Sequence, residues 1–426
     1  MRKVIKNGLV ISMDETRDKI EKVDIVIDDD TITSITNNYE GTCDLLIDAE
    51  GKIVMPGLIN CHTHLGMSYF RATNDDLTLQ DWLTKKIWPI EDKMNNEDAY
   101  LSSLVSLLEM IKTGTTTSND MYFNTDGTLK ALKESKTRCL FTRCLMGNKD
   151  TDNGRIDEFI KLYNENKDND LIKFSVAPHA LYTCDLEYLK RCNTLAKELK
   201  LSVHIHYCEN KEELDNIRKA YNMEPIEVLK ESGLINNKLI LAHGTFLSDD
   251  DLNSFKDKDV TVVHNPLSNL NLGCGIADIS KYRKYVNVAL GTDGVGSGNN
   301  LNMFYHMSLV DLLQKGLYED PTVMSSYEVL KMATINGAKA LGMDNIIGSI
   351  KEGKKADIII LDMNDTLTKP SVDIINNVCH NAFNSVSTTI VNGEVLMLNK
   401  KILLNIDEKE LIKKCEERID LLNKKN

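Results

Sequence analysis

The sequence lacks the features of several large protein classes. Its ten cysteines are scattered and no two form a Cys-x-x-Cys pair, so a cysteine-built zinc site is not expected. No apolar run approaches the ~20 residues that a membrane-spanning helix needs. Lysine and arginine number 51 against 64 acidic residues, and the net charge of −13 disfavours nucleic acid or an anionic membrane as a partner. No sequence repeat or low-complexity segment is visible.

The composition is that of an ordinary globular chain. Its 426 residues are 42% hydrophobic and 27% charged, which is enough for a large core. The opening stretch MRKVIKNGLVISMDET turns polar after a short alternating run, which is not typical of a signal peptide. Together with the unpaired cysteines, this pattern predicts reduced thiols and a cytoplasmic location.

The two ends of the chain differ in pattern from its middle. Residues 1–57 hold short, alternating, Val/Ile-rich runs such as KVIKNGLVIS, separated by turn signals. In residues 58–345, strand candidates such as LSVHIHY and VTVVHN alternate with helical stretches, which predicts a parallel sheet. Residues 346–426 return to strands and end in a charged amphipathic helix. We therefore expect an α/β fold: a (β/α)8 TIM-type barrel with a smaller composite β-sandwich domain built from both chain ends.

The stretch MPGLINCHTHLG places two histidines at the end of a hydrophobic strand. Residues i and i+2 of a strand point to the same face, so the imidazoles of His62 and His64 project together. Two imidazoles aimed at one point indicate a metal site. The alternative is a pair of partly buried histidines that bond to the backbone.

Further polar residues at strand ends decide between these two readings. Such residues close the later strand candidates: His179, His204, His206, His243, His264 and Asp293. Because active sites of (β/α)8 barrels form at the carboxyl ends of the strands, the joint pattern predicts a metal site. Its expected ligands are His62, His64, His206 and Asp293, with one position open for water. His204 lies one layer deeper than His206 on the same face, so we interpret it as structural.

Glu209 lies three residues beyond His206, in the stretch HIHYCEN. The strand gives way to a loop there, so the carboxylate can reach water at the metal site and act as a general acid and base. The alternative is an ordinary surface glutamate.

Five motifs of the chain resemble those of the amidohydrolase superfamily of metal-dependent hydrolases: PGLINCHTH, HIHYCEN, LAHG, VVHNPLSN and LGTDG. Within it, the chain resembles the S-adenosylhomocysteine/5′-methylthioadenosine deaminases and related chlorohydrolase-type enzymes. The resemblance implies one zinc ion per subunit, with iron or manganese as alternatives, on the four ligands named above. It assigns proton transfer to Glu209 and contact with substrate or water to His243, while Asp293 helps to deprotonate the attacking water.

The resemblance also implies a set of substrate contacts: Trp82, Glu91, Arg143, Arg155, His179 and Ser297. Trp82 would stack on adenine and Glu91 would bind the ribose hydroxyls. Alternatively, Trp82 belongs to the core and Glu91 is a solvated helix residue. Arg143 and Arg155 match arginines assigned to a homocysteine carboxylate, which guanidinium groups bind in a bidentate manner. Taken singly, each arginine is an ordinary surface charge.

The activity implied by the resemblance is hydrolytic deamination by an aminohydrolase that acts on cyclic amidines. S-Adenosylhomocysteine would give S-inosylhomocysteine and 5′-methylthioadenosine would give methylthioinosine, with adenosine as a further substrate and ammonia as the second product. A guanine or pterin deaminase, a triazine-type hydrolase and an inactive scaffold of the same fold remain alternatives. Small-molecule nucleosides are the expected partners, and the family implies a homodimer or homotetramer.

Overall fold

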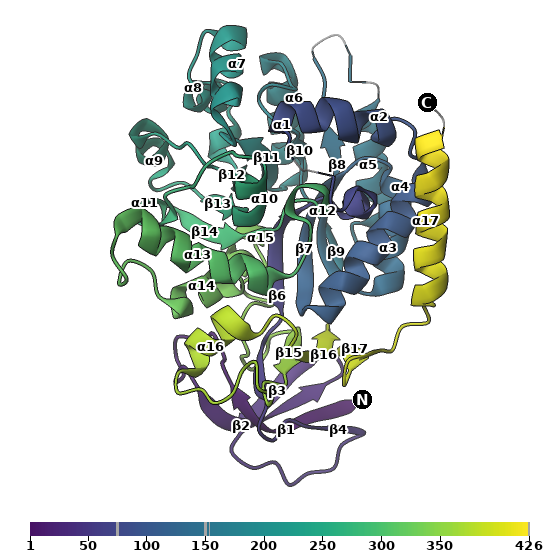
Figure 1. Ribbon diagram of the computed structural model, residues 1–426, viewed down its shortest axis with the longest axis vertical. Helices are drawn as coiled ribbons and strands as arrows, with labels where there is room; N and C mark the ends of the chain where they lie inside the picture. Colours follow the sequence, from purple (N-terminus) through teal and green to yellow (C-terminus); the bar gives the residue numbers. More distant parts are fainter. Residues whose placement is uncertain (74–75, 149–150, 153, 425–426) are drawn as a thin grey trace.

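Parallel strands form the centre of the molecule (Figure 1). The structure, a computed structural model, describes residues 1–73, 76–148, 151–152 and 154–424. The parallel strands are β6 (Leu58–Thr63), β7 (Thr115–Tyr122), β8 (Arg138–Leu145), β9 (Ile172–Phe174), β10 (Ala177–Pro178), β11 (Val203–Tyr207), β12 (Leu239–His243), β13 (Val260–His264) and β14 (Asn287–Leu290). β6, β7 and β8 pair in that order, β9 and β10 both pair with β8, and β11 to β14 pair in sequence.

Backbone contacts connect these two parallel sheets at both edges. A bridge between Val176 and Val203 joins the β9–β10 region to β11. At the other edge, the carbonyl of His62 in β6 accepts hydrogen bonds from the amides of Thr292 and Asp293, which follow β14. The resulting curled parallel sheet is consistent with the predicted TIM-type barrel.

Helices surround the parallel strands and cap one end of them. They are η1 (Leu65–Phe70), α1 (Leu79–Trp82), η2 (Leu83–Ile87), α2 (Trp88–Glu91), α3 (Asn96–Lys112), α4 (Thr125–Ser135), α5 (Arg155–Asn166), α6 (Leu186–Leu199), α7 (Lys211–Tyr221), α8 (Pro225–Glu231), η3 (Leu234–Asn236), α9 (Asp249–Phe255), α10 (Pro266–Asn271), α11 (Ile279–Tyr282), α12 (Val295–Gly298), α13 (Met303–Tyr318), α14 (Ser326–Met332), α15 (Ile335–Leu341), α16 (Ile374–Asn381) and α17 (Glu408–Lys424). The terminal helix α17, yellow in Figure 1, lies along α3, where Arg418 donates two hydrogen bonds to the carboxylate of Asp98. In the described part of the chain, no helix has the length and apolar character needed to cross a membrane.

Strand β7 is the element that the sequence patterns do not predict. Its sequence, TTTSNDMY, has no apolar alternation, yet every position is buried. The strand pairs with β6 on one side and β8 on the other. Backbone pairing within the parallel sheet therefore holds a segment whose side chains alone do not favour burial.

The two chain ends form one mixed sheet, at the bottom of Figure 1. Its nine strands are β1 (Arg2–Val10), β2 (Glu21–Asp28), β3 (Thr31–Thr36), β4 (Leu45–Asp48), β5 (Ile53–Pro56), β15 (Ile358–Leu361), β16 (Val386–Val391), β17 (Glu394–Leu398) and β18 (Lys401–Ile402). Ile25 and Ile27 of the first end share an apolar core with Ile358 and Ile390 of the second. The expected union of the two ends is thus observed, whereas their arrangement as a two-layer sandwich stays a prediction.

A buried ion pair fixes the chain-end sheet to the parallel strands. Arg138 at the start of β8 donates from Nε and Nη2 to the carboxylate of Asp357, at 2.9 and 3.0 Å. Both residues are only 4% exposed, and Asp357 also accepts a hydrogen bond from the amide of Asn392. Because both charges are shielded from water, each depends on the other for compensation.

Replacing Asp357 with Ala should therefore destabilise the fold by about 3–5 kcal/mol, because the buried Arg138 guanidinium loses its partner. Urea unfolding followed by circular dichroism measures the change. Glu394→Ala is the matched control, since it removes the exposed pair between Glu394 of β17 and Lys136, which directly follows α4. That variant should lose at most about 1 kcal/mol. Equal losses in the two variants would contradict the role assigned to the buried pair.

Candidate metal centre and active site

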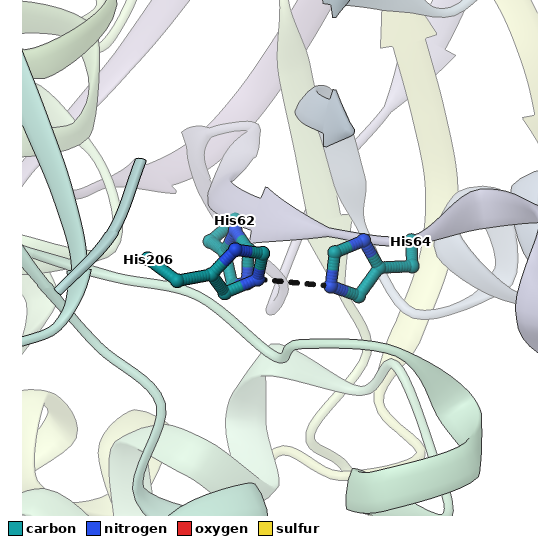
Figure 2. A group of neighbouring side chains, drawn as sticks. All are labelled: His62, His64 and His206. Atoms are coloured by element: carbon teal, nitrogen blue, oxygen red, sulfur yellow. Dashed lines mark hydrogen bonds between the residues drawn. The ribbon is translucent and has the colours of Figure 1, made fainter. Parts of the chain in front are cut away.

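Three histidines from two strands meet at the carboxyl ends of the parallel strands (Figure 2). His62 lies in β6, His64 directly follows that strand, and His206 lies in β11. Nε2 of His64 is 3.3 Å from Nε2 of His206. One ring nitrogen from each of the three histidines lies within 4.8 Å of the others. The structure thus brings together the three imidazoles that strand geometry predicts as ligands.

Backbone carbonyls determine how two of these rings are turned. Nδ1 of His64 lies 2.5 Å from the carbonyl oxygen of Met121, and Nδ1 of His206 lies 2.7 Å from that of His179. Since a carbonyl oxygen only accepts, each Nδ1 carries a proton. The opposite nitrogen, Nε2, is the one that faces the common point. This arrangement is typical of histidines that bind a metal.

Asp293 completes the cluster from the segment that follows β14. Its Oδ1 lies 3.1 Å from Nε2 of His64 and 3.5 Å from Nε2 of His62. The hydroxyls of Ser268 and Ser297 both donate to Oδ2 at 2.7 Å, which leaves Oδ1 directed at the histidines. Asp293 has a φ of +61°, and such a left-handed conformation persists at functional sites when surrounding contacts enforce it.

The electrostatics of this cluster suit a bound cation. Burial lowers the pKa of His62 to about 3 and keeps it neutral, the form in which imidazole binds metals. Burial also lowers the pKa of His64, but Asp293 outweighs this effect and raises it to about 9. A positive charge beside Asp293 is therefore favourable, and a metal ion would supply it. The buried Nε2 of His62 has no hydrogen-bond partner among the described residues, as a ligand atom requires.

His204 lies behind the cluster rather than within it. It is fully buried in β11, and its Nε2 lies 2.9 Å from Nδ1 of His62. The contact fixes the orientation of the His62 ring from the side away from the other ligands. This position agrees with the structural role expected for His204.

Glu209 and His243 lie beside the cluster, after β11 and at the end of β12. Oε1 of Glu209 is 3.7 Å from Nδ1 of His243, and the same nitrogen lies 2.8 Å from Oδ1 of Asn269. A ring nitrogen of His243 is also within 4.8 Å of ligand atoms of His62 and Asp293. Burial raises the pKa of Glu209 above its usual value, which is the direction that a general acid needs.

A cavity with about 650 Å³ of empty space, counting its opening to solvent, lies in front of the cluster. Its lining includes Trp82, Glu91, His179, His64, His206, Glu209, His243 and Asp293. Trp82 is buried, and its indole Nε1 donates to the hydroxyl of Thr73 at 3.2 Å. Glu91 accepts a hydrogen bond from the hydroxyl of Tyr122 at 2.8 Å, and burial raises the pKa of Glu91 to about 7. The lining of the cavity combines these polar groups with apolar side chains, which is typical of a small-molecule site.

The two arginines expected to contact the substrate do not line the cavity but bond to residues that do. Arg143 donates to a carboxylate oxygen of Glu158 at 2.7 Å and to the carbonyl of Cys144 at 2.9 Å. Arg155 donates to the carbonyl of Met146 at 3.0 Å. Cys144 and Met146 line the cavity whereas the arginines do not. Both guanidinium groups therefore lie at the same part of the cavity wall, and each already donates hydrogen bonds to protein acceptors.

Several supporting residues carry no signal in the strand pattern. Ser297, expected to contact substrate, donates to Asp293 and is not among the residues that line the cavity. Ser268 binds the same carboxylate, and Asn269 orients His243. Both belong to the stretch NPLSN directly after β13. Only this position after a strand could have marked them as site residues from the sequence. Their individual roles follow only from the three-dimensional contacts.

Known proteins are similar to this chain in sequence and architecture. The amidohydrolase family profile matches residues 53–396. A protein of Thermoanaerobacter pseudethanolicus named 5-methylthioadenosine/S-adenosylhomocysteine deaminase is 42% identical over 425 residues, covering 98% of each chain. A Methanosarcina acetivorans protein named 5′-deoxyadenosine deaminase is 39% identical over 419 residues, covering 97% of this chain and 96% of that protein.

A solved structure is similar along the whole chain as well. The crystal structure of an adenosine deaminase from Xanthomonas campestris with bound zinc superposes with a TM-score of 0.95. It is 28% identical and covers 99% of this chain and 98% of its own. The family match and the full-length relatives lead to one conclusion. The chain belongs to the amidohydrolase family.

Proposed function

We propose that this protein deaminates adenosine-type nucleosides by hydrolysis and releases ammonia. S-Adenosylhomocysteine, 5′-methylthioadenosine and adenosine are the candidate substrates. The observation that carries the proposal is the buried Glu209 carboxylate beside His243 and the histidine–aspartate cluster, on the wall of a cavity that Trp82 also lines. Full-length relatives named as deaminases of such nucleosides support it, as does the fold shared with an adenosine deaminase.

One divalent cation per subunit belongs to this proposal, with zinc first and iron or manganese as alternatives. Its ligands would be His62, His64, His206 and Asp293. The inward-facing imidazole nitrogens and the zinc in the related adenosine deaminase support this assignment. When bound, such a cation supplies an activated water, since it lowers the pKa of water from about 15.7 toward about 7.

The protein's own residues would move the protons of the reaction. Asp293 and His243 take up the proton of the water that attacks C6 of the adenine ring. Glu209 protonates N1 of the ring and then helps to pass a proton to the departing ammonia. The upward shift of the pKa of Glu209 on burial supports this role, because it favours proton donation by this group.

Nucleoside binding would use the remaining cavity residues. Trp82 stacks on the adenine ring and Glu91 binds the ribose hydroxyls, and His179 lines the same cavity. Arg143 and Arg155 would bind a homocysteine carboxylate at the part of the wall formed by Cys144 and Met146. Ser297 would act through Asp293, to which its hydroxyl donates.

Other family reactions form the second candidate, namely guanine or pterin deamination and triazine hydrolysis. They would use the same metal ligands. Glu209 favours ring deamination, because protonation of the ring and departure of ammonia need a proton donor. Guanine has no ribose and would offer Glu91 no sugar hydroxyl to bind. An inactive scaffold would not need Glu209 and His243 to be held beside the cluster.

The domain boundaries, location and assembly are part of the proposal. The barrel would span residues 58–345, and residues 1–57 and 346–426 would form the composite β-sandwich domain, which their shared apolar core supports. Ten free cysteines support a cytoplasmic location. Exposed Tyr305, Leu312 and Leu317 on α13 support a homodimer or homotetramer.

Replacing Glu209 with Gln should lower kcat by at least about 100-fold, because an amide cannot donate the required proton. Metal content measured by mass spectrometry should stay near one ion per chain, since Glu209 is not a proposed ligand. Glu212→Gln removes an exposed charge from the same segment and should keep the kcat of the wild type. Near-normal turnover by the Glu209 variant would refute its role.

An ammonia-release assay with adenosine, 5′-methylthioadenosine, S-adenosylhomocysteine and guanine separates the candidate reactions. Ammonia should appear with at least one nucleoside and not with guanine, because Glu91 is proposed to bind a ribose. The kcat/KM values of the three nucleosides then rank them. Release from guanine alone would replace the nucleoside proposal with the second candidate.

Nucleoside affinity should depend on pH through Glu91. Burial raises its pKa to about 7, so the carboxylate that accepts from ribose hydroxyls is present above that pH and lost below it. KM for adenosine should therefore rise as pH falls from 8 to 6. KM for 2′,3′-dideoxyadenosine, which lacks both hydroxyls, should change less over the same range. Parallel KM profiles for the two nucleosides would exclude Glu91 as the ribose acceptor.

A further inference from the structure

The segment that carries Glu209 is short and conformationally unusual. Only Cys208, Glu209 and Asn210 connect the end of β11 to the start of α7. Cys208 has a φ of +51°, in the left-handed region that non-glycine residues rarely adopt. The direction of the Glu209 side chain therefore depends on a backbone turn that other groups must support.

The buried carboxylate of Glu213, in the first turn of α7, binds this turn directly. One oxygen accepts the amide of Cys208 at 3.2 Å, and the other accepts the amide of Glu209 at 2.6 Å. In return, the amide of Glu213 donates to the side-chain oxygen of Asn210 at 2.7 Å. Glu213 is 4% exposed, so water offers these amides little competition. Burial and the nearby Glu209 carboxyl raise the pKa of Glu213 to about 7, while the two amides and the helix N-terminus favour its charged form.

The Glu209 carboxylate itself has only distant polar neighbours. Its Oε1 lies 3.7 Å from Nδ1 of His243 and 3.9 Å from the thiol of Cys274. Among the residues that the structure describes, no closer hydrogen bond to this carboxylate is found. The backbone conformation, more than any side-chain contact, therefore sets where Glu209 points.

We propose that Glu213 is a positioning residue for catalysis, which binds the amides of Cys208 and Glu209 and thereby aims the Glu209 carboxylate at His243 and the cavity. The inference rests on the proposed role of Glu209 in deamination. It follows that two acceptor oxygens are needed at position 213, one for each amide. A glutamine keeps one acceptor oxygen, whereas an alanine keeps none.

The test compares Glu213→Ala and Glu213→Gln with the control Glu212→Gln, which changes an exposed neighbour by the same charge. Glu213→Ala should lower kcat by at least about tenfold, as expected when a reacting group is misplaced. Its KM for the best nucleoside and its metal content should stay close to those of the wild type. Glu213→Gln should lie between Glu213→Ala and the wild type, and Glu212→Gln should match the wild type. If Glu213→Ala does not fold, Glu213→Gln is compared with the wild type and with Glu212→Gln instead.

Two kinetic results would overturn the proposal. One is an unchanged kcat in Glu213→Ala. The other is a parallel loss of kcat, nucleoside affinity and metal, which would give Glu213 a purely structural role. Crystal structures of the wild type and of a Glu213 variant provide an independent readout, in which the Glu209 carboxylate should move away from His243; an unmoved Glu209 also overturns the proposal. If the wild type deaminates no nucleoside, the proposed function fails, while the crystal comparison still tests the positioning of Glu209.

Discussion

The carboxylate of Asp293 is the charge on which the arrangement of the site depends. It is buried among imidazoles, and burial of an ionised group is costly unless a cation compensates it. The oxygen nearest His62 and His64 faces inward because two serine hydroxyls bind the other oxygen. A proton on His64 can supply the positive charge that compensates Asp293. A metal ion held by the three neighbouring imidazoles would compensate this carboxylate more fully.

The common direction of the parallel strands brings these groups together. Parallel strands deliver their final residues to one edge, so residues as distant in sequence as His62 and Asp293 become neighbours. Main-chain bonds from the amides of Thr292 and Asp293 to the carbonyl of His62 join the last strand to the first at that edge. The chain-end sheet lies at the opposite end, where the Arg138–Asp357 pair fixes it without contact to the site.

Sequence patterns predict the strand-end residues well and their supporting contacts poorly. The two-residue spacing of His62 and His64, and the polar residues His206 and Asp293 at or beyond the ends of later strands, point to the cluster. Parallel strands deliver the residues that end or follow them to one edge of the sheet. Strand patterns do not predict β7, because its side chains are mostly polar although every position is buried. They also fail for Ser297, because the short helix α12 turns this hydroxyl back onto Asp293, four residues earlier, and Ser297 does not line the cavity.

The most direct test of this account is a zinc-edge X-ray absorption spectrum of the protein expressed with supplemented zinc, together with its metal content. The account predicts one ion per chain, bound by three imidazole nitrogens and by carboxylate or water oxygen, with the aspartate contribution lost in Asp293→Ala. Protein that binds no zinc, iron or manganese under these conditions, or that binds metal equally well without Asp293, would contradict it.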